Sequence, residues 1–498
     1  MKRFFFWCST ALALFIAIFL GLNLFDSRPA PNDPAPVLPA GNLEPANGFF
    51  LIWGFAEPPG TDPLAPGFRR QVNELFASRS RTSFNRSPYG RWLARLNSGH
   101  ARHWQGLNLY FPQSHDEDPS AYFVIRRARV AAWQERFAPL LRRYQQLLLA
   151  GRLEDFTPLG RECPARSLTL ATQTAKLFAA SQLLAAVDGS WPEAGGGLLQ
   201  ALAAGLRLVD SGRTIKVNAL GRTMVELSLR ALASLLNRRD CPPGFVRLVL
   251  ESLPQVESAR FGTANVRLFL WMSFRSAIGR VKGEKVVDPS LLKDYFREPA
   301  AFYALERFVA LSGARVFTLV HALAAFFIKE NETVGMMRDS WERIGRLEES
   351  PPWKWGQETR PFAQRTPVPA GDALFWWLRN PLGKMMARSA MPFTWPILRH
   401  YVYRTHELKS RYDLVRLLAQ ARLAAGTAMR LETAALRRLL DAAEERDPFN
   451  GAPYRFSPEQ EVIYGFGSDR DDDNGREGTE LWRDSDIAVP INFVIRDS

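Results

Sequence analysis

Apolar residues recur at intervals of three and four positions through most of residues 120–446, which is the spacing of amphipathic helices. Leu170, Leu177 and Leu184 fall seven positions apart and share one helical face. Ser167 precedes them and is a residue type that caps helix N-termini. The pattern therefore predicts a helix that begins near Ser167.

A second helix is predicted directly after the first. Gly189 is expected to end the first helix, and the glycines at 195–197 are expected to form the turn. The apolar residues of segment 198–209 then repeat at steps of four, four and three, so the two helices form a hairpin. The same spacing predicts further helices at Thr214–Leu236, Phe245–Leu253, Val256–Val281, Leu291–Leu311, Arg315–Ile328, Val334–Leu347 and Tyr412–Glu445.

Helical hairpins joined by short turns must stack on their neighbours to cover their apolar faces. We therefore expect a mainly α fold, with a helical body at 120–349 that forms a bundle of solenoid-like character. The apolar run at 316–328 has only 13 residues, which is too short for a bilayer, and is expected to be a buried helix. An irregular aromatic segment (49–119), a Pro-rich connection (350–375) and a further helical segment (376–446) complete this part of the chain.

The period changes from helical to strand-like in the last 52 residues, 447–498. Short strands are expected at Tyr454–Phe456, Val462–Phe466 and Ile487–Ile495. The pattern predicts a small antiparallel β unit of three strands, packed against the helix that ends near Arg446.

Residues 4–25 carry no charge and are long enough to span the hydrocarbon core of a bilayer. Lys2 and Arg3 are expected to stay on the cytoplasmic side, which sends the rest of the chain out of the cytoplasm. We therefore predict a transmembrane anchor at 1–26 in the inner (cytoplasmic) membrane, with the bulk of the chain in the periplasm. A cleaved signal peptide is the alternative. Segment 27–48 contains six prolines and is expected to be an extended stalk.

Composition adds limits on function. With 46% hydrophobic and 23% charged residues, the chain has a globular composition rather than a disordered one. Its net charge of +13 is unevenly divided, because the last 52 residues carry −7 and the rest carry +20. This positive charge has two possible interpretations. It forms a basic face toward anionic lipid headgroups, or it belongs to helix faces that are simply exposed to water. A recognition motif for nucleic acid is absent from the sequence, so no nucleic-acid partner is expected.

Two of the three cysteines, Cys163 and Cys241, precede prolines in expected loops. In an oxidising compartment they could form a disulfide that closes a loop of about 78 residues and stabilises the chain by roughly 4 to 5 kcal/mol. Two free thiols are the alternative. CxxC pairs are absent from the sequence, which argues against zinc.

The tail resembles the C-terminal segment of the major pseudopilins of type II secretion systems over about 45 residues. The residues that carry this resemblance are Asp447, Pro448, Phe449, Gly451, Pro453, Tyr454, Tyr464, Gly467, Asp469, Asp486 and Ile487. The N-terminus lacks the processing glycine and glutamate of that family, so assembly into a pseudopilus is not implied. Through NGFFLIWGFAEPPG, NPLGKMMARSAMP and the tail, the whole chain also resembles uncharacterised bacterial single-pass envelope proteins.

The pseudopilin resemblance implies a structural calcium ion, with Ser468, Asp469 and Asp486 as its first candidate ligands. Asp471 and Asp473 alternate with Asp469, and oxygen-rich loops of this kind suit Ca²⁺, which takes six to eight oxygen ligands. An EF-hand is a weaker interpretation, because strands rather than helices are expected on both sides of the loop. A solvated acidic loop without metal is the third alternative.

The sequence contains no motif of hydrolases, phosphate-binding loops or dinucleotide-binding enzymes within the sequence context that such a motif requires. We therefore expect a scaffold or adaptor that binds an envelope protein rather than an enzyme, since helical stacks offer broad binding surfaces. An accessory role in type II secretion or type IV pili is one alternative. A periplasmic glycan-acting hydrolase is another, because a pair of carboxylates cannot be recognised from sequence spacing.

Overall fold

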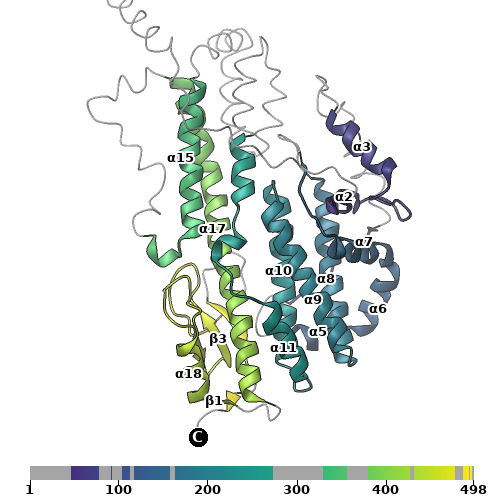
Figure 1. Ribbon diagram of the computed structural model, residues 1–498, viewed down its shortest axis with the longest axis vertical. Helices are drawn as coiled ribbons and strands as arrows, with labels where there is room; N and C mark the ends of the chain where they lie inside the picture. Colours follow the sequence, from purple (N-terminus) through teal and green to yellow (C-terminus); the bar gives the residue numbers. More distant parts are fainter. Residues whose placement is uncertain are drawn as a thin grey trace, which may run out of the picture.

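The structure is a computed structural model that describes residues 46–77, 91, 104–112, 117–157, 163–272, 329–355, 380–426, 431–476, 486–492 and 494–495. These residues form a mainly helical fold with a small antiparallel sheet of three strands, as expected. The C-terminal strands lie beside the lower half of a long helix in the view of Figure 1, next to the helical body. The body and the C-terminal unit share one large apolar core.

Three long helices form the centre of the body: α8 (Ala165–Val187), α9 (Trp191–Ser211) and α10 (Ile215–Leu236). They lie side by side and pack on one another (Figure 1). The predicted hairpin of α8 and α9 is confirmed, and Gly189 after α8 adopts a φ of 95°, which favours glycine.

The glycines at 195–197 are not a turn, and this prediction was wrong. They lie within α9, where a Cβ atom on Gly195 would come 2.8 Å from the ring of Phe245 and one on Gly197 would come 2.7 Å from Gln182 Oε1. The glycines therefore allow α9 to approach its neighbours closely. The chain turns earlier, at Gly189 and Ser190.

Ser167 is not an N-cap either, because α8 begins two residues before it. Its fully buried hydroxyl donates to the carbonyl oxygen of Trp53 at 3.0 Å and accepts from the amide of Ala56 at 3.3 Å. A hydroxyl in this position satisfies backbone groups at the end of another helix. The sequence pattern could not distinguish this tertiary role from a local cap.

That other helix, α2 (Phe49–Gly54), lies in the segment expected to be irregular, and all six of its residues are buried. Asn47 fixes its start, since Oδ1 accepts from the amides of Phe49 and Glu154. The same segment also contains α3 (Pro66–Ala77). Three shorter helices then lead into the centre of the body: α5 (Pro119–Ile125), α6 (Arg127–Arg136) and α7 (Ala138–Leu149).

After α10 the chain forms α11 (Pro243–Ser252), the short η3 (Ser258–Phe261) and a helix over residues 264–272. The next described elements are α15 (Glu330–Glu349), η4 (Pro352–Lys354) and the 45-residue α17 (Pro381–Ala425), and α15 and α17 pack together. The helix expected at Tyr412–Glu445 is two helices, because α17 ends before Gly426, whose φ is 61°. The strand β1 (Leu431–Glu432) and α18 (Thr433–Ala442) follow.

The C-terminal sheet has the order β2-β3-β4, with β2 at Arg455–Ser457, β3 at Val462–Gly465 and β4 at Ile487–Pro490. Both pairings are antiparallel, so the expected three-stranded unit is confirmed. The strand expected at Ile487–Ile495 is divided, because β5 (Val494–Ile495) pairs in parallel with β1 instead. The sheet packs mainly on α17 rather than on α18.

Several predicted elements lie outside the described residues. They are the anchor at 1–26, residues 27–45 of the expected stalk, the helices Leu291–Leu311 and Arg315–Ile328, and most of the Pro-rich connection at 350–375. Within the described part of the chain, none of the helices combines the length and apolar character needed to cross a bilayer.

Candidate functional site

The motif residues that open the tail hold its backbone together. The carboxylate of Asp447 is buried and accepts from the amides of Phe449 at 2.9 Å and Phe466 at 2.8 Å. Tyr454 OH donates to Asp413 Oδ2 on α17 at 3.1 Å. Burial raises the pKa of both Asp447 and Asp413 to about 6. The conspicuous residues of this motif are therefore structural in the described tail.

The acidic loop between β3 and β4 holds the residues expected to bind calcium. Asp469 Oδ1 accepts from the amide of Asp471 at 3.1 Å, as in an Asx turn. Asp472, which the sequence analysis did not select, is the best-connected acid of this loop. Its carboxylate pairs with Arg455, accepts from Tyr464 OH at 3.1 Å and accepts from the amide of Asn474 at 3.1 Å.

Asp486 is the predicted calcium ligand with the most unusual environment. Its side chain is 1% exposed, and Oδ2 accepts from the amide of Gly475 at 2.9 Å. Within the described residues, Oδ1 has no hydrogen-bond partner. Burial, together with the negative charges of Asp472 and Asp473, raises the pKa of Asp486 to about 7. At neutral pH this carboxyl is therefore divided between its protonated and its ionised form, and a cation beside it would favour the ionised form.

The loop thus brings Asp486 close to Asp472 and Asp473, with Asp469 and Asp471 placed further along it. Among the residues that the structure describes, no three His, Cys, Asp or Glu side chains are grouped so that they could hold a metal ion. Residues 477–485, which connect the loop to Asp486, lie outside that description. The calcium site therefore stays a prediction, and the unpartnered oxygen of Asp486 is the observation that fits it.

Cys163 and Cys241 are both buried, and neither forms a disulfide in this structure. Cys163 lies two residues before α8, and Cys241 lies in the short connection between α10 and α11. Burial raises the pKa of the Cys241 thiol to about 11, which keeps it protonated and weakly nucleophilic at neutral pH.

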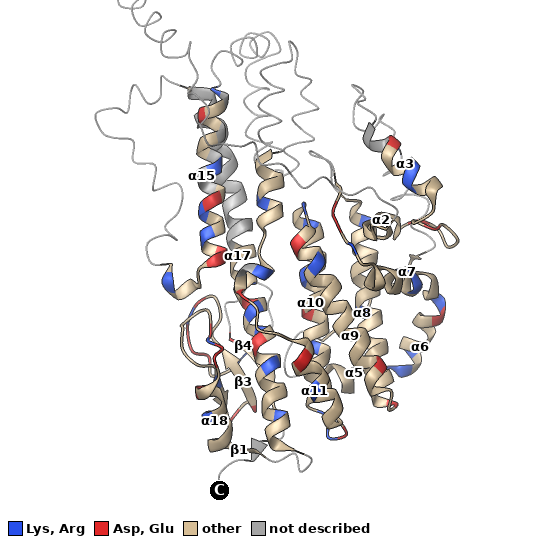
Figure 2. Cartoon of the chain, viewed as in Figure 1, with Lys and Arg blue, Asp and Glu red and all other residues tan. Residues whose placement is uncertain are grey.

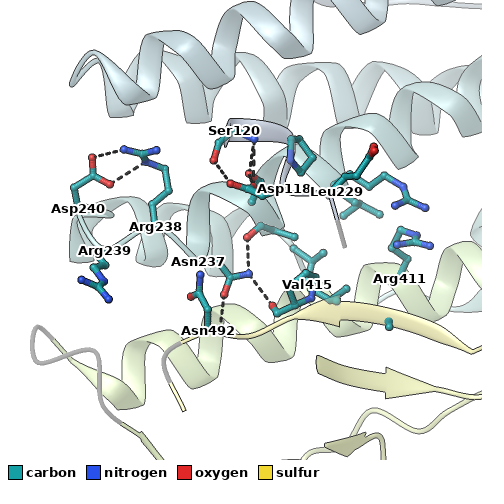
Figure 3. Close-up of a pocket in the computed structure, with 18 residues that line it drawn as sticks. Asp118, Ser120, Leu229, Asn237, Arg238, Arg239, Asp240, Arg411, Val415 and Asn492 are labelled. Carbon is teal, nitrogen blue, oxygen red and sulfur yellow. Dashed lines mark hydrogen bonds and ion pairs between the residues drawn. The ribbon is translucent and has the colours of Figure 1, made fainter. Parts of the chain in front are cut away.

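A pocket of about 480 Å³ lies at the junction of the helical body and the C-terminal unit. Its walls come from the start of α5, the C-terminal half of α10, the C-terminal third of α17 and strand β4. Figure 3 shows Arg238, Arg239 and Asp240 at one end and Arg411 at the other, with Asn237 and Val415 between them. A volume of this size is typical of sites for small organic molecules.

Four arginines and three acids line the pocket, and each of the acids accepts hydrogen bonds from neighbouring groups. Asp118 accepts from Ser120 and Ala121 at the start of α5 and from the Ser234 hydroxyl. Asp240 forms a two-point ion pair with Arg238, at 2.9 and 2.8 Å. Glu117, the third acid, accepts from Tyr110 OH at 2.8 Å.

Two further arginines of the pocket, Arg230 and Arg411, lie on facing helices close to half-buried acids. Arg230 pairs with Glu226 at 3.3 Å, and both arginines lower the pKa of Glu226 against the opposing effect of burial. Burial instead raises the pKa of Glu407, which pairs with Arg404 at 3.0 Å. Glu226 and Glu407 are not among the residues that line this pocket, and each of them pairs with an arginine.

A second candidate site is an exposed patch formed by Tyr110, Tyr122, Ile125, Arg126 and Arg129, which we name the α5–α6 surface. Ile125 is 81% exposed and Tyr110 is 49% exposed. The rings of Tyr110 and Tyr122 meet edge to face at 5.6 Å, and the Arg126 guanidinium stacks 3.7 Å from the centre of the Tyr122 ring. An apolar patch bordered by fixed aromatic and arginine side chains is typical of a protein-binding surface.

The histidines add no reactive group in the described residues, where only His400 and His406 are found. His406 is fully buried, its Nε2 lies 3.0 Å from the carbonyl oxygen of Leu347, and its ring packs against Trp355 and Phe449. Burial lowers the pKa of His406 to about 4, so the ring is neutral at physiological pH. It acts as a core side chain.

The comparisons with known proteins add no family. No protein-family model matches the chain, and no curated protein or solved structure matches it either.

Proposed function

We propose that this chain is a membrane-anchored adaptor of the cell envelope, held by residues 4–25 in the inner membrane, whose periplasmic body binds another protein through the α5–α6 surface. The observation that carries this proposal is Ile125, a large apolar side chain that is 81% exposed beside stacked arginine and tyrosine side chains. Exposing such an apolar side chain to water is unfavourable in free energy, and a bound partner that covers the side chain removes this unfavourable contribution.

Charge indicates the kind of partner. Residues 120–136 contain Arg126, Arg127, Arg129 and Arg136 but a single acid, Glu135. Arg127 is paired with Asp188 at 2.7 Å, whereas the guanidinium groups of Arg126 and Arg129 lie over aromatic rings. A partner segment that combines acidic side chains with an apolar anchor for Ile125 complements this surface.

A lipid surface fits less well. Glu117 contacts Tyr110 of the α5–α6 surface and Asp188 pairs with the neighbouring Arg127, and anionic headgroups would repel both acids. Lys and Arg positions also lie on several different helices in Figure 2 and alternate there with Asp and Glu positions. A protein partner tolerates such a mixture of charges, because each charge can meet its own counterpart.

The test is site-specific photo-crosslinking in the native envelope. A photoreactive amino acid replaces Ile125 in the full chain, and a second strain carries it at Leu423, an exposed apolar position on α17. We expect a protein adduct from position 125 that is absent from position 423, and mass mapping should find the crosslinked peptide in an acidic segment. An added Arg129→Glu substitution should lower the yield about tenfold, because it reverses a charge at the contact.

An adduct with phospholipid, equal adducts from both positions, or a yield unaffected by Arg129→Glu would overturn the proposal. The identity of the captured protein then separates the alternatives. A pilin-like subunit would favour an accessory role in type II secretion or type IV pili, whereas another envelope protein would favour the general adaptor.

A structural calcium ion in the tail is a second proposal, and Asp486 favours it. Its buried Oδ1 lacks a partner within the described residues, and its pKa of about 7 shows how strongly this environment disfavours an uncompensated charge. Such an ion would stabilise the C-terminal unit and would not take part in chemistry.

A further inference from the structure

We infer that the pocket between α5, α10, α17 and β4 binds a small organic anion, a molecule with a carboxylate or phosphate head and a short apolar portion. The inference rests on arginines at both ends of the pocket and on apolar side chains between them. It does not rest on the α5–α6 surface, whose exposed Ile125 lies at the C-terminal end of α5 and does not line the pocket.

Arginine side chains lie at both ends of the pocket. Within the described residues, Arg239 is exposed and has no ion-pair partner, although it lies beside the Arg238–Asp240 pair. At the opposite end, Arg411 is 9% exposed, so its guanidinium is largely shielded from water. A charge in such an environment attracts an anion more strongly than a charge in open solvent does.

The arginines are also held in position before any ligand arrives. Glu226 lies behind Arg230 and Arg411 on facing helices, and Asp240 fixes Arg238 by two hydrogen bonds. Side chains that are already ordered lose less conformational entropy on binding. Guanidinium groups suit carboxylate and phosphate heads in particular, since their geometry allows two parallel hydrogen bonds.

The apolar portion of the ligand is inferred from the middle of the pocket. Leu229, Val415 and Val489 contribute to its lining between the two cationic ends. Arg230 and Asn237 are seven residues apart along α10 and its cap, which corresponds to about 10 Å. A chain of about six carbon atoms with one anionic head fits within that length.

The pocket also requires both parts of the molecule. Asn237 Nδ2 donates to the carbonyl oxygen of Pro490 at 2.7 Å, and its Oδ1 accepts from the amide of Asn492 at 3.3 Å. These bonds hold β4 against the end of α10 and close one wall. A ligand in the pocket would therefore contact the body and the C-terminal unit together and stabilise their association.

The test is titration calorimetry on the purified full chain with hexanoate and hexyl phosphate as probes, and with hexanamide as the neutral counterpart. We expect one site per chain for at least one anionic probe, with a Kd of about 1 mM or tighter, and no heat from hexanamide. Arg239→Gln and Arg411→Lys should each weaken binding roughly tenfold, the first by removing a charge and the second by removing a two-point contact.

The matched control is Arg247→Gln, on an exposed arginine of α11 that does not line the pocket, and it should bind like the parent chain. Arg239→Gln alters an exposed side chain, so its fold is expected to persist, and circular dichroism verifies this for each variant. The inference is overturned if neither anion binds, if hexanamide binds as well as hexanoate, or if Arg239→Gln and Arg411→Lys leave both affinities unchanged.

Discussion

The side-chain amide of Asn237, directly after α10, donates a hydrogen bond of 2.7 Å to the carbonyl oxygen of Pro490, although the two residues are 253 positions apart in the sequence. Asn237 also donates to Ala233 and accepts from Asn492, so its amide is saturated at a buried position. It is a principal polar link between the helical body and strand β4, and the apolar core continues across the same junction.

We expect Asn237→Leu to destabilise the protein by about 1 to 3 kcal/mol, because a side chain of similar size leaves the buried carbonyl of Pro490 without its donor. Chemical denaturation measures the change. Limited proteolysis should also cleave the C-terminal unit faster in this variant. Asn492→Asp is the control, since the backbone amide of Asn492, not its exposed side chain, makes the bond to Asn237. If both variants behave like the parent chain, this link does not secure the sheet.

The buried side chain of Arg143 on α7 donates hydrogen bonds to several backbone carbonyl groups. Its guanidinium donates to the carbonyl oxygens of Gly54, Phe55, Glu57, Pro58 and Thr61, over distances of 2.7 to 3.3 Å. It thereby satisfies the C-terminal end of α2 and the loop that follows. Burial lowers the pKa of Arg143 to about 10, so the side chain stays charged at neutral pH.

Arg143→Met should therefore destabilise the protein by about 3 to 5 kcal/mol, because buried carbonyls lose a charged donor. Arg143→Lys should be intermediate, since an ammonium group cannot reach as many acceptors at once. Arg142→Met, on the exposed neighbouring position, should change the free energy of unfolding by less than about 0.5 kcal/mol. Equal effects at both positions in thermal denaturation would contradict this role.

Amphipathic helices were the most predictable part of the fold, because one buried face leaves a period of three to four residues in the sequence. The pattern failed where burial is not one-sided. All six residues of α2 are buried, so FFLIWG has no polar face that would indicate its type. The junction of α17 and α18 also escaped prediction, since only the backbone conformation at Gly426 and the pairing of β1 with β5 separate the two helices.

The candidate sites were less predictable, because their residues meet only in three dimensions. The pocket combines segments near residues 118, 234, 411 and 489, which no local motif connects. Asp472 was overlooked for the same reason, as its partners Arg455 and Tyr464 lie on neighbouring strands. The resemblance to pseudopilins selected Asp486, whereas its buried and unpartnered oxygen became visible only in the structure.

Glycines inside helices allow a sharp comparison. A Cβ atom on Gly205 of α9 would lie 2.8 Å from the carbonyl oxygen of Gly221, and one on Gly221 of α10 would lie 2.7 Å from that of Gly205. The helices therefore touch through their backbones at this point. Gly196 also lies in α9, but a Cβ atom there would meet nothing within 4 Å.

We expect Gly205→Ala and Gly221→Ala each to destabilise the protein by about 1 to 3 kcal/mol, because two helix backbones must move apart. Gly196→Ala should instead stabilise it by about 0.5 to 1 kcal/mol through the higher helix propensity of alanine. Thermal and chemical denaturation of the three variants test this directly. The close contact between α9 and α10 is refuted if all three substitutions shift stability in the same direction.

Asp486 gives the tail a pH dependence of defined sign. Its pKa of about 7 lies above the value near 4 of an unfolded chain, so the folded state holds the proton more tightly. The contribution of this group is therefore complete below about pH 4 and is lost as pH rises toward 7. Asp447 and Asp413 each have a pKa of about 6, so their contributions to the free energy of unfolding also decrease as pH rises.

In the absence of divalent cations, the free energy of unfolding should thus decrease from pH 5 to pH 8. Asp486→Asn should be more stable than the parent chain at pH 8 by about 1 to 3 kcal/mol, because the amide needs no proton.

Calcium at about 5 mM should reverse this order by stabilising only the parent chain, since a bound cation compensates the carboxylate. Asp471→Asn is the control, because it removes one negative charge from an exposed position of the same loop. Its effect shows how much of the Asp486→Asn result comes from the change in net charge alone. A parent chain whose stability is the same at pH 5 and pH 8 would contradict the raised pKa, and an unchanged melting temperature in calcium would exclude the ion.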